Sequence, residues 1–238
     1  MSRGLGDVYK RQLLLRISGK GYRGVLAVGK DPSRLSIEMA TTLGTAGQLS
    51  GTIAEAHNGV LAMNANGFLD PNGEGDGSQL AGWCMSNGEG CGTHFADGAY
   101  QRIELSENGL NCRIVPASDP VGEGTYSAAE FMPALIRDGE KLENQDWTGE
   151  QPRACFGAGD QGIYMLVIEG RYPDEGIRGT SVNTCADILL AYGCRNAINM
   201  DGGSSAILWY DGEYITQSSS VTLRYTGGRP LPNAWVYG

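Results

Sequence analysis

The chain has 238 residues, of which 41% are hydrophobic and 19% are charged, and this balance is typical of one folded domain with its own core. A formal net charge of −9 without a Lys/Arg stripe argues against nucleic-acid binding, because phosphate contacts dominate that affinity. No apolar run approaches the roughly 18–20 residues of a membrane span. The 37 glycines fall in short clusters between apolar runs, as in strand-rich domains with many tight turns.

Residues 1–12 (MSRGLGDVYKRQ) lack hydrophobic periodicity and stop abruptly against a strand-like run. They resemble a translated adapter sequence, so we expect a non-native leader over 1–12 and one domain over 13–238. The apolar run Leu13–Leu15 is too short for a signal-peptide core of roughly 7–15 residues. We therefore expect that the native start and its export signal are missing, and that the protein is secreted or resides in the cell envelope.

Apolar runs bounded by turn residues predict many short strands. In chain order these are Leu13–Ser18, Gly24–Val28, Arg34–Met39, Val60–Asn64, Ala81–Ser86, Asn111–Val115, Ala134–Ile136, Arg153–Gly157, Ile163–Glu169, Ala197–Met200, Ala206–Tyr210, Val221–Tyr225 and Asn233–Tyr237. Turn signals separate them, among them Asn72-Gly73, Asp138-Gly139 and Asp211-Gly212.

Two helices are expected, a short one over Thr52–His57 and a better defined one over Val182–Tyr192. In the second, Ile188 and Leu189 share a face with the final tyrosine, and Gly193 follows as a stop signal. The whole pattern indicates an α+β fold: a single domain of mixed, largely antiparallel sheet with few helices.

The first segment with chemical potential is AMNANGFLD at 62–70, which follows a predicted strand. The side chains of Asn64 and Asn66 carry both hydrogen-bond donors and acceptors, which suit sugar hydroxyls or phosphate oxygens. A turn with Asn66 in the left-handed conformation is the alternative.

The next segment, DPNGEGDGSQLA at 70–81, places oxygen-bearing side chains at alternate positions and Gly75 at the sixth, as in a calcium loop. Its twelfth position is Ala81, where such loops carry a bidentate glutamate, and no predicted helices flank it. We expect no cofactor, with calcium here as the lesser alternative and a solvated loop partly covering the site as the preferred interpretation.

The six cysteines contain no CxxC pair, so the usual zinc and thioredoxin-like patterns are absent from the sequence. Cys84 and Cys91 flank a glycine-rich loop and could close a small disulfide, but reduced, partly buried thiols are the preferred interpretation. Cys185 and Cys194 would lie about 13 Å apart across the predicted helix, too far for a bond.

Two arginines stand out because a planar guanidinium matches phosphate oxygens and stays charged. Arg153 begins a predicted strand in PRACFG, and Arg229 lies in GGRPLPN. An ordinary surface arginine is the alternative for both. The letters GAGDQG at 157–162 match GxGxxG, but no predicted helix follows them, so we interpret them as a hairpin and not as a dinucleotide site.

The strongest local feature is AINMDGGSSA at 197–206, where a predicted strand ends in Asp201. Gly202 and Gly203 permit strained backbone angles and close approach of a ligand, and Ser204 and Ser205 add hydroxyl and N–H groups. A carboxylate at the rigid end of a buried strand suits nucleophilic or general-base chemistry. A hairpin turn explains the same pattern equally well.

Other catalytic constellations have weaker support. A triad of His57 or His94 with Ser204 or Ser205 stays open, although no GxSxG elbow is present. A metal-dependent phosphodiesterase that cuts the P–O bond is weaker still, because the sequence contains no visible His/Asp cluster.

Taken in order, these segments resemble the phosphodiester glycosidase family over roughly residues 20–238. The resemblance rests on NANGF at 64–68, PR at 152–153, a helix ending in Gly-Cys, AINMDGGSS at 197–205 and GRPLPNA at 228–234. It implies hydrolysis of a sugar from a glycosyl-1-phosphodiester, and bacterial relatives are often labelled exopolysaccharide-related. A phosphate monoester is a good leaving group, so positive groups on the phosphate should matter more than its protonation.

The resemblance assigns Asp201 as nucleophile or base, Arg153 and Arg229 as phosphate clamps, and Asn64 and Asn66 as orienting groups. The loop around the substrate would consist of Gly202, Gly203 and Ser204, and Asn233 would also contact substrate. The chain departs from the pattern at Thr184, where relatives often carry an acidic residue. That departure favours the alternative of a non-catalytic envelope module that binds a sugar phosphate or polysaccharide.

Overall fold

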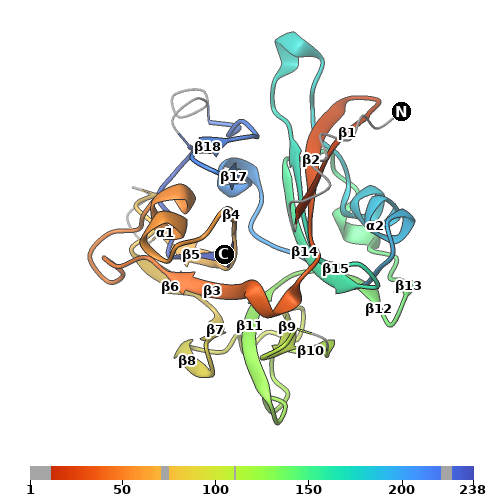
Figure 1. Ribbon diagram of the computed structural model, residues 1–238. Coiled ribbons are helices and arrows are strands. Elements are labelled where there is room, and N and C mark those ends of the chain that lie inside the picture. Colours follow the sequence, from red (N-terminus) through yellow and green to blue (C-terminus); the bar gives the residue numbers. More distant parts are fainter. Residues whose placement is uncertain (1–11, 71–74, 110, 221–226) are drawn as a thin grey trace.

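Antiparallel pairing dominates the computed structural model, which describes residues 12–70, 75–109, 111–220 and 227–238 (Figure 1). Seven strands form the largest sheet, in the order β1 (Gln12–Gly19), β2 (Tyr22–Gly29), β15 (Gly162–Glu169), β14 (Arg153–Gly159), β16 (Cys194–Asn199), β12 (Ala134–Arg137) and β13 (Glu140–Lys141). A second sheet, the β9 sheet, has the order β10 (Cys112–Pro116), β9 (Gln101–Ser106), β11 (Thr125–Phe131), β7 (Trp83–Ser86) and β8 (Glu89–Gly92).

A third sheet, the β4 sheet, has the order β18 (Glu213–Tyr214), β17 (Leu208–Tyr210), β4 (Leu61–Asn64), β19 (Asn233–Tyr237) and β3 (Leu35–Met39). A separate hairpin pairs β5 (Gly67–Leu69) with β6 (Gln79–Ala81). All recorded pairs are antiparallel within the described residues, and two α-helices complete this part of the chain: α1 (Ser50–Ala56) and α2 (Val182–Ala191). The predicted α+β class is confirmed.

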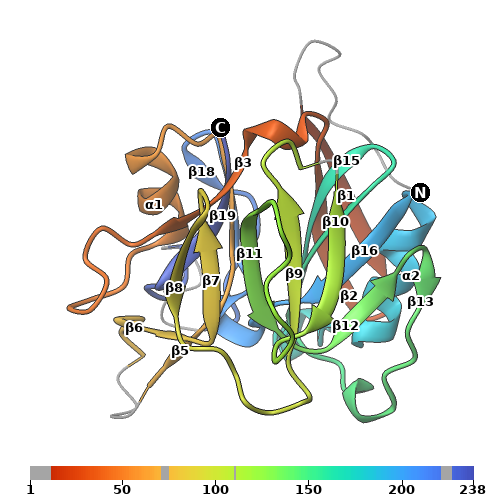
Figure 2. The same cartoon turned by 90° about the horizontal axis from the view of Figure 1, so that it is seen from below.

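The main core lies where the three larger sheets meet (Figure 2). There Phe156 of β14 stacks on Trp235 of β19, with ring centroids 3.8 Å apart, and Ile103 contributes from the β9 sheet. The opposite face of the seven-stranded sheet is covered by α2, so β15 is buried along its whole length. Because both faces of the strand are covered, residues 163–168 of β15 form an uninterrupted apolar run.

Most predicted elements are confirmed, with small shifts at their ends. Helix α2 begins after Ser181, whose hydroxyl accepts from the Thr184 N–H, and it ends before Gly193, which has φ +88°. Helix α1 begins at Ser50, two residues before the prediction. The 157–162 segment is the predicted hairpin, joining β14 to β15.

Two predictions concern residues that the structure does not describe. Gln12 pairs with Gly29 in β1, while 1–11 of the expected leader lie outside the described residues. The predicted strand Val221–Tyr225 also lies outside them. Strands β9 and β11 were not predicted.

Cys84 and Cys91 are direct cross-strand partners, yet all six cysteines are free. The described helices include none that could span a membrane.

Candidate active site around Asp201

The Asp201 segment connects two different sheets. It leaves β16 of the seven-stranded sheet and enters β17 of the β4 sheet, and the blue ribbon of Figure 1 crosses to β17 in this way. A hairpin would instead pair the two flanking strands with each other. The hairpin alternative is therefore wrong, and residues 203–205 form a short 3-10 turn at the crossing.

Hydrogen bonds from both sheets fix the loop between β16 and β17, residues 200–207, which we call the Asp201 loop. The N–H groups of Met200 and Gly203 donate to the carbonyls of Ala154 (2.8 Å) and Pro152 (3.2 Å) at the start of β14. On the other side, Asn64 Nδ2 donates to the Asp201 carbonyl at 2.6 Å, and Asn64 Oδ1 accepts from Ile207 N–H at 3.4 Å. Asn64 is fully buried, so it holds the loop by its amide.

The two glycines are required by close approach and by backbone angle. A Cβ on Gly202 would lie 2.8 Å from the Pro152 carbonyl oxygen, closer than van der Waals contact allows. Gly203 has φ +59°, a left-handed conformation that costs glycine little. The expected strained backbone angle is therefore found at Gly203, whereas close approach of a ligand stays a prediction.

Asp201 is partly exposed, but its carboxyl is closely surrounded by protein. Burial raises the pKa of the Asp201 carboxyl, and three weaker influences oppose it: the Ser205 hydroxyl, the charge of Arg229 and the Gly202 N–H. A carboxyl group whose pKa is raised by burial is a better proton acceptor than a solvated one. Such a group at a loop crossing is a candidate catalytic base or nucleophile.

Arg229 lies beside this carboxyl. Its Nη1 donates to Ser204 Oγ at 3.3 Å, and its guanidinium lies 4.4 Å from the centre of the Phe68 ring. Among the described residues Arg229 forms no ion pair, although its charge acts on the Asp201 carboxyl. The structure thus brings together Asp201, Gly202, Gly203, Ser204 and Arg229.

The side chain of Arg153 makes its contacts outside the Asp201 loop. Its guanidinium donates to the carbonyls of Thr180 (3.2 Å) and Gly149 (2.9 Å), and it packs 5.7 Å from the Trp147 ring centre. The side chain is buried, and burial lowers its pKa. These contacts support the segments on either side of Gln151, so direct contact between Arg153 and a phosphate stays a prediction.

Asn66 and Asn233 form a reciprocal hydrogen-bonded pair between the end of β4 and the start of β19. Asn66 N–H donates to Asn233 Oδ1, and Asn233 Nδ2 donates to Asn66 Oδ1, both at 3.0 Å. The Asn66 amide also donates to the Trp83 and Glu130 carbonyls. Both residues are fully buried. Their observed contacts join β4, β19 and the β9 sheet, whereas contact with substrate stays a prediction.

Arg171 is a residue that sequence analysis missed. It lies two residues beyond the end of β15 and is exposed, and a Cβ on Gly203 would lie 3.2 Å from its Nη1. Its Nε and Nη2 both donate to Gln151 Oε1, at 3.1 and 2.8 Å. The signal was available: Arg171 follows the end of a buried strand, as Asp201 does.

Other predicted groups have contacts of their own. Nδ1 of His57 pairs with Glu38 at 2.9 Å, and Nδ1 of His94 pairs with Glu130 at 2.5 Å. Thr184 accompanies the Ser181 cap of α2, with their hydroxyls 3.1 Å apart. Of the suggested calcium loop, 71–74 lie outside the described residues, so calcium is untested there. The described side chains include no cluster of three metal-ligating groups.

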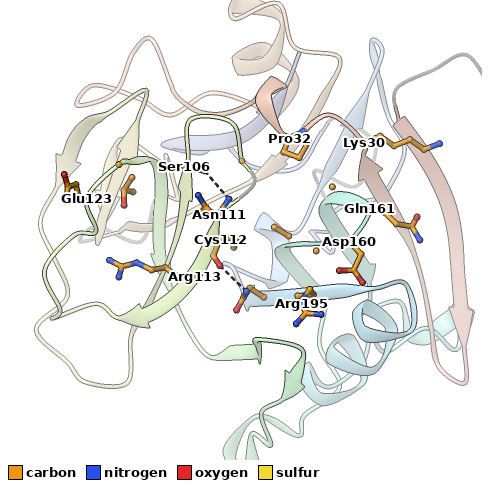
Figure 3. A pocket seen from close by; sticks show the side chains of 17 residues that line it. Lys30, Pro32, Ser106, Asn111, Cys112, Arg113, Glu123, Asp160, Gln161 and Arg195 are labelled. Carbon is orange, nitrogen blue, oxygen red and sulfur yellow. Dashed lines mark hydrogen bonds between the residues drawn. The ribbon is translucent and has the colours of Figure 1, made fainter.

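A large cavity lies at the opposite end of β16. It has a volume of about 640 Å³, and side chains of both charges line it, including Lys30, Asp160 and Arg195 (Figure 3). β16 runs from Cys194 to Asn199, so the strand separates this cavity from Asp201 by roughly 20 Å at about 3.3 Å per residue. The cavity is therefore distinct from the Asp201 loop.

One family profile matches most of the chain. The family profile described as phosphodiester glycosidase matches residues 57–237. The uncharacterised SPbeta prophage-derived protein YomE of Bacillus subtilis (strain 168) is 25% identical over 175 residues. That alignment covers 71% of this chain but only 27% of YomE, so the chain spans about a quarter of the length of this relative.

Solved structures show the same fold at low identity. The auto-inhibited catalytic domain of zebrafish N-acetylglucosamine-1-phosphodiester alpha-N-acetylglucosaminidase aligns with a TM-score of 0.75 and 16% identity, covering 100% of this chain and 86% of that one. A hypothetical protein from Synechocystis aligns at 0.64 and 15%, covering 99% and 63%. A protein from Burkholderia pseudomallei K96243, described as a proposed exported protein, aligns at 0.57 and 14%, covering 91% and 74%.

Proposed function

We propose, from the premise that the chain belongs to the phosphodiester glycosidase family, that this glycosidase-type hydrolase releases a sugar from a glycosyl-1-phosphodiester. The single observation that carries the proposal is the Asp201 loop. A carboxyl group with a raised pKa lies there beside Arg229, which forms no ion pair among the described residues. Cell-envelope or exported polysaccharide is the substrate class we propose, with the protein acting outside the cytoplasm.

The chemistry divides between these two groups. Asp201 either takes a proton from the water that attacks the anomeric carbon or attacks that carbon itself, and the bond between the carbon and the phosphate oxygen breaks. In the second case a glycosyl ester forms on Asp201, and a water molecule then hydrolyses it and restores the carboxylate. The bonding electrons leave with the phosphate, giving a free sugar and a phosphate monoester. Arg229 stabilises the charge that builds on the departing oxygens. Asn64 acts as a positioning residue through the Asp201 carbonyl, and Gly202, Gly203 and Ser204 form the wall around the reacting group.

The roles of the remaining predicted residues are indirect in this proposal. Arg153 supports the 149–151 segment and Thr180 by its two hydrogen bonds to carbonyls. Asn66 and Asn233 hold the end of β4 against the start of β19. A change at any of the three should therefore affect folding stability as well as activity.

A panel of glycosyl-1-phosphodiesters with different sugars tests the proposal. Purified protein should release free sugar and a phosphate monoester from at least one of them. In ¹⁸O-labelled water the label should enter the sugar, because the C–O bond breaks; label in the phosphate would mean P–O cleavage and would overturn the mechanism.

The same panel separates the enzyme from a non-catalytic envelope module. Saturable binding without product release from any member would support the module. Thr184 is the observation that favours this second function, since its hydroxyl and N–H belong to the capping contacts of α2 and supply no acid.

A further inference from the structure

We propose that Arg171 is a second anion-binding residue of the Asp201 site, and that with Arg229 it binds the non-bridging oxygens of a phosphodiester. The inference deepens the proposed function, because it names the groups that would recognise the phosphate. It also differs from the sequence prediction, which assigned that role to Arg153.

Arg171 lies directly against the Asp201 loop. A Cβ built on Gly203 would be 3.2 Å from its Nη1, 3.5 Å from its Nη2 and 3.6 Å from its Cζ. Arg229 contacts the adjacent residue, with Nη1 3.3 Å from Ser204 Oγ. Two guanidinium groups thus lie against consecutive residues of one loop, Gly203 and Ser204. In this proposal an anion bound at the loop meets both.

The charge of Arg171 is not neutralised by a carboxylate within the described part of the chain. Its recorded side-chain partner is the neutral Gln151, whose Oε1 accepts from Nε at 3.1 Å and from Nη2 at 2.8 Å. A guanidinium has five N–H donors, and within the described residues no hydrogen bond is recorded from those on Nη1. In a chain of net charge −9, an exposed arginine oriented by an amide instead of a carboxylate keeps its full attraction for an anion.

The backbone holds Arg171 in an uncommon conformation. Its φ is +64°, in the left-handed region that residues with a Cβ rarely adopt, and its N–H donates to the Arg178 carbonyl at 3.2 Å. The next residue, Tyr172, donates its hydroxyl to the Ser218 carbonyl at 2.8 Å, and Ser218 Oγ donates to the Ser204 carbonyl at 3.1 Å. These contacts tie Arg171 to the loop that Arg229 also contacts, and such strain persists where surrounding contacts enforce it.

Arg153 has a supporting position in this arrangement. Its two acceptors, the carbonyls of Gly149 and Thr180, belong to the segments beside Gln151, and Gln151 itself exchanges backbone hydrogen bonds with Thr180. Arg153 thereby holds the residue that orients Arg171. Arg153 is therefore a positioning residue, which acts on the anion through Gln151 and Arg171.

Titration with inorganic phosphate, followed by calorimetry, tests this inference without any need for turnover. Arg171→Gln should weaken phosphate binding about tenfold, since one charge-assisted contact is lost. Arg171→Lys should bind with intermediate affinity, because it keeps the charge and loses the fork. Arg178→Gln is the matched control: an exposed arginine of the same segment that pairs with Glu150. Its phosphate affinity should equal that of the unmodified protein.

Two results would overturn the inference: no phosphate binding by the unmodified protein, or equal affinities for Arg171→Gln and Arg178→Gln. Kinetics with an active glycosyl-1-phosphodiester provide a second readout, in which Arg171→Gln should raise KM and Arg178→Gln should not. Failure of every phosphodiester to react, together with Arg171-dependent phosphate binding, would refute the proposed hydrolysis and leave the anion site standing.

Discussion

The two ends of strand β16 differ in almost every property that is used to recognise a functional site. At its start, Arg195 and Asp160 line a cavity of about 640 Å³, and both side chains are exposed. Beyond its end, Asp201 lies in a tight loop with a carboxyl group whose pKa is raised by burial. Volume favours the first end as a binding site, whereas charge and burial favour the second.

The cavity has a structural explanation that requires no ligand. It lies between the turn of the β14–β15 hairpin, the start of β16 and the region where β9 and β10 are joined. A Cβ on Gly159 would lie 2.2 Å from the Gly193 carbonyl oxygen, so the hairpin turn and the turn before β16 touch through glycine. Exposed side chains around such a junction are solvated, and opposite charges among them contribute little. A carboxyl group whose pKa is raised by burial in a tight loop is therefore better evidence for chemistry than empty space.

The largest difference between the two ends of β16 is expected from the substitution Asp201→Asn. Asparagine keeps the shape of the side chain and removes the anionic carboxylate, so turnover of an active glycosyl-1-phosphodiester should fall by about a thousandfold or more. Steady-state kinetics with that substrate measure the effect. Asp160→Asn provides the matched control, because it makes the same chemical change at the cavity end, and it should leave kcat and KM unchanged. Near-normal turnover by the Asp201 variant would refute its assignment.

Most of the fold could be predicted because its strands are either fully apolar or end in clear turn signals. β9 and β11 could not, because they carry buried charges that break the apolar pattern. Arg102 and Glu104 of β9 are 0% and 2% exposed and pair at 2.7 Å, while Glu130 of β11 accepts from the N–H groups of Trp83 and Phe95. Compensation of this kind depends on partners distant in sequence, and residue order alone does not reveal it.

Some residues of the candidate site could be predicted from the sequence and others could not. Asp201 could be found because a carboxylate at the end of an apolar strand has a local signature. The direction of Arg153 follows from strand alternation, which places it on the same face as Cys155, in the cluster covered by α2. The contact between Arg171 and Gly203 joins residues 32 positions apart and depends on how two loops meet, so only the structure reveals it.

Asp201→Asn should also change the pH dependence of stability. Burial raises the pKa of this carboxyl, so the folded protein holds its proton more tightly than the unfolded chain does. The stabilising contribution of the group is complete below its ordinary pKa of 3.8 and is lost as pH rises through the raised value. The neutral asparagine escapes that loss, so the variant should have the larger free energy of unfolding at neutral pH.

Urea denaturation of both proteins, from about pH 8 down to about pH 4, measures this difference. The advantage of the variant should shrink steadily as the pH falls. A constant advantage across the range would mean that packing, and not the charge of Asp201, causes it.

The smallest effect is expected from Arg195→Ala at the cavity end of β16. The Arg195 side chain is exposed, and the contact that it makes through its carbonyl, with Gly139 N–H at 2.8 Å, survives the substitution. The free energy of unfolding should therefore change by no more than about 0.5 kcal/mol, and kcat/KM should stay within about twofold. Thermal denaturation and the same kinetic assay measure both quantities. A tenfold loss of kcat/KM with unchanged stability would place substrate in the cavity, and volume would then be the better guide to the site.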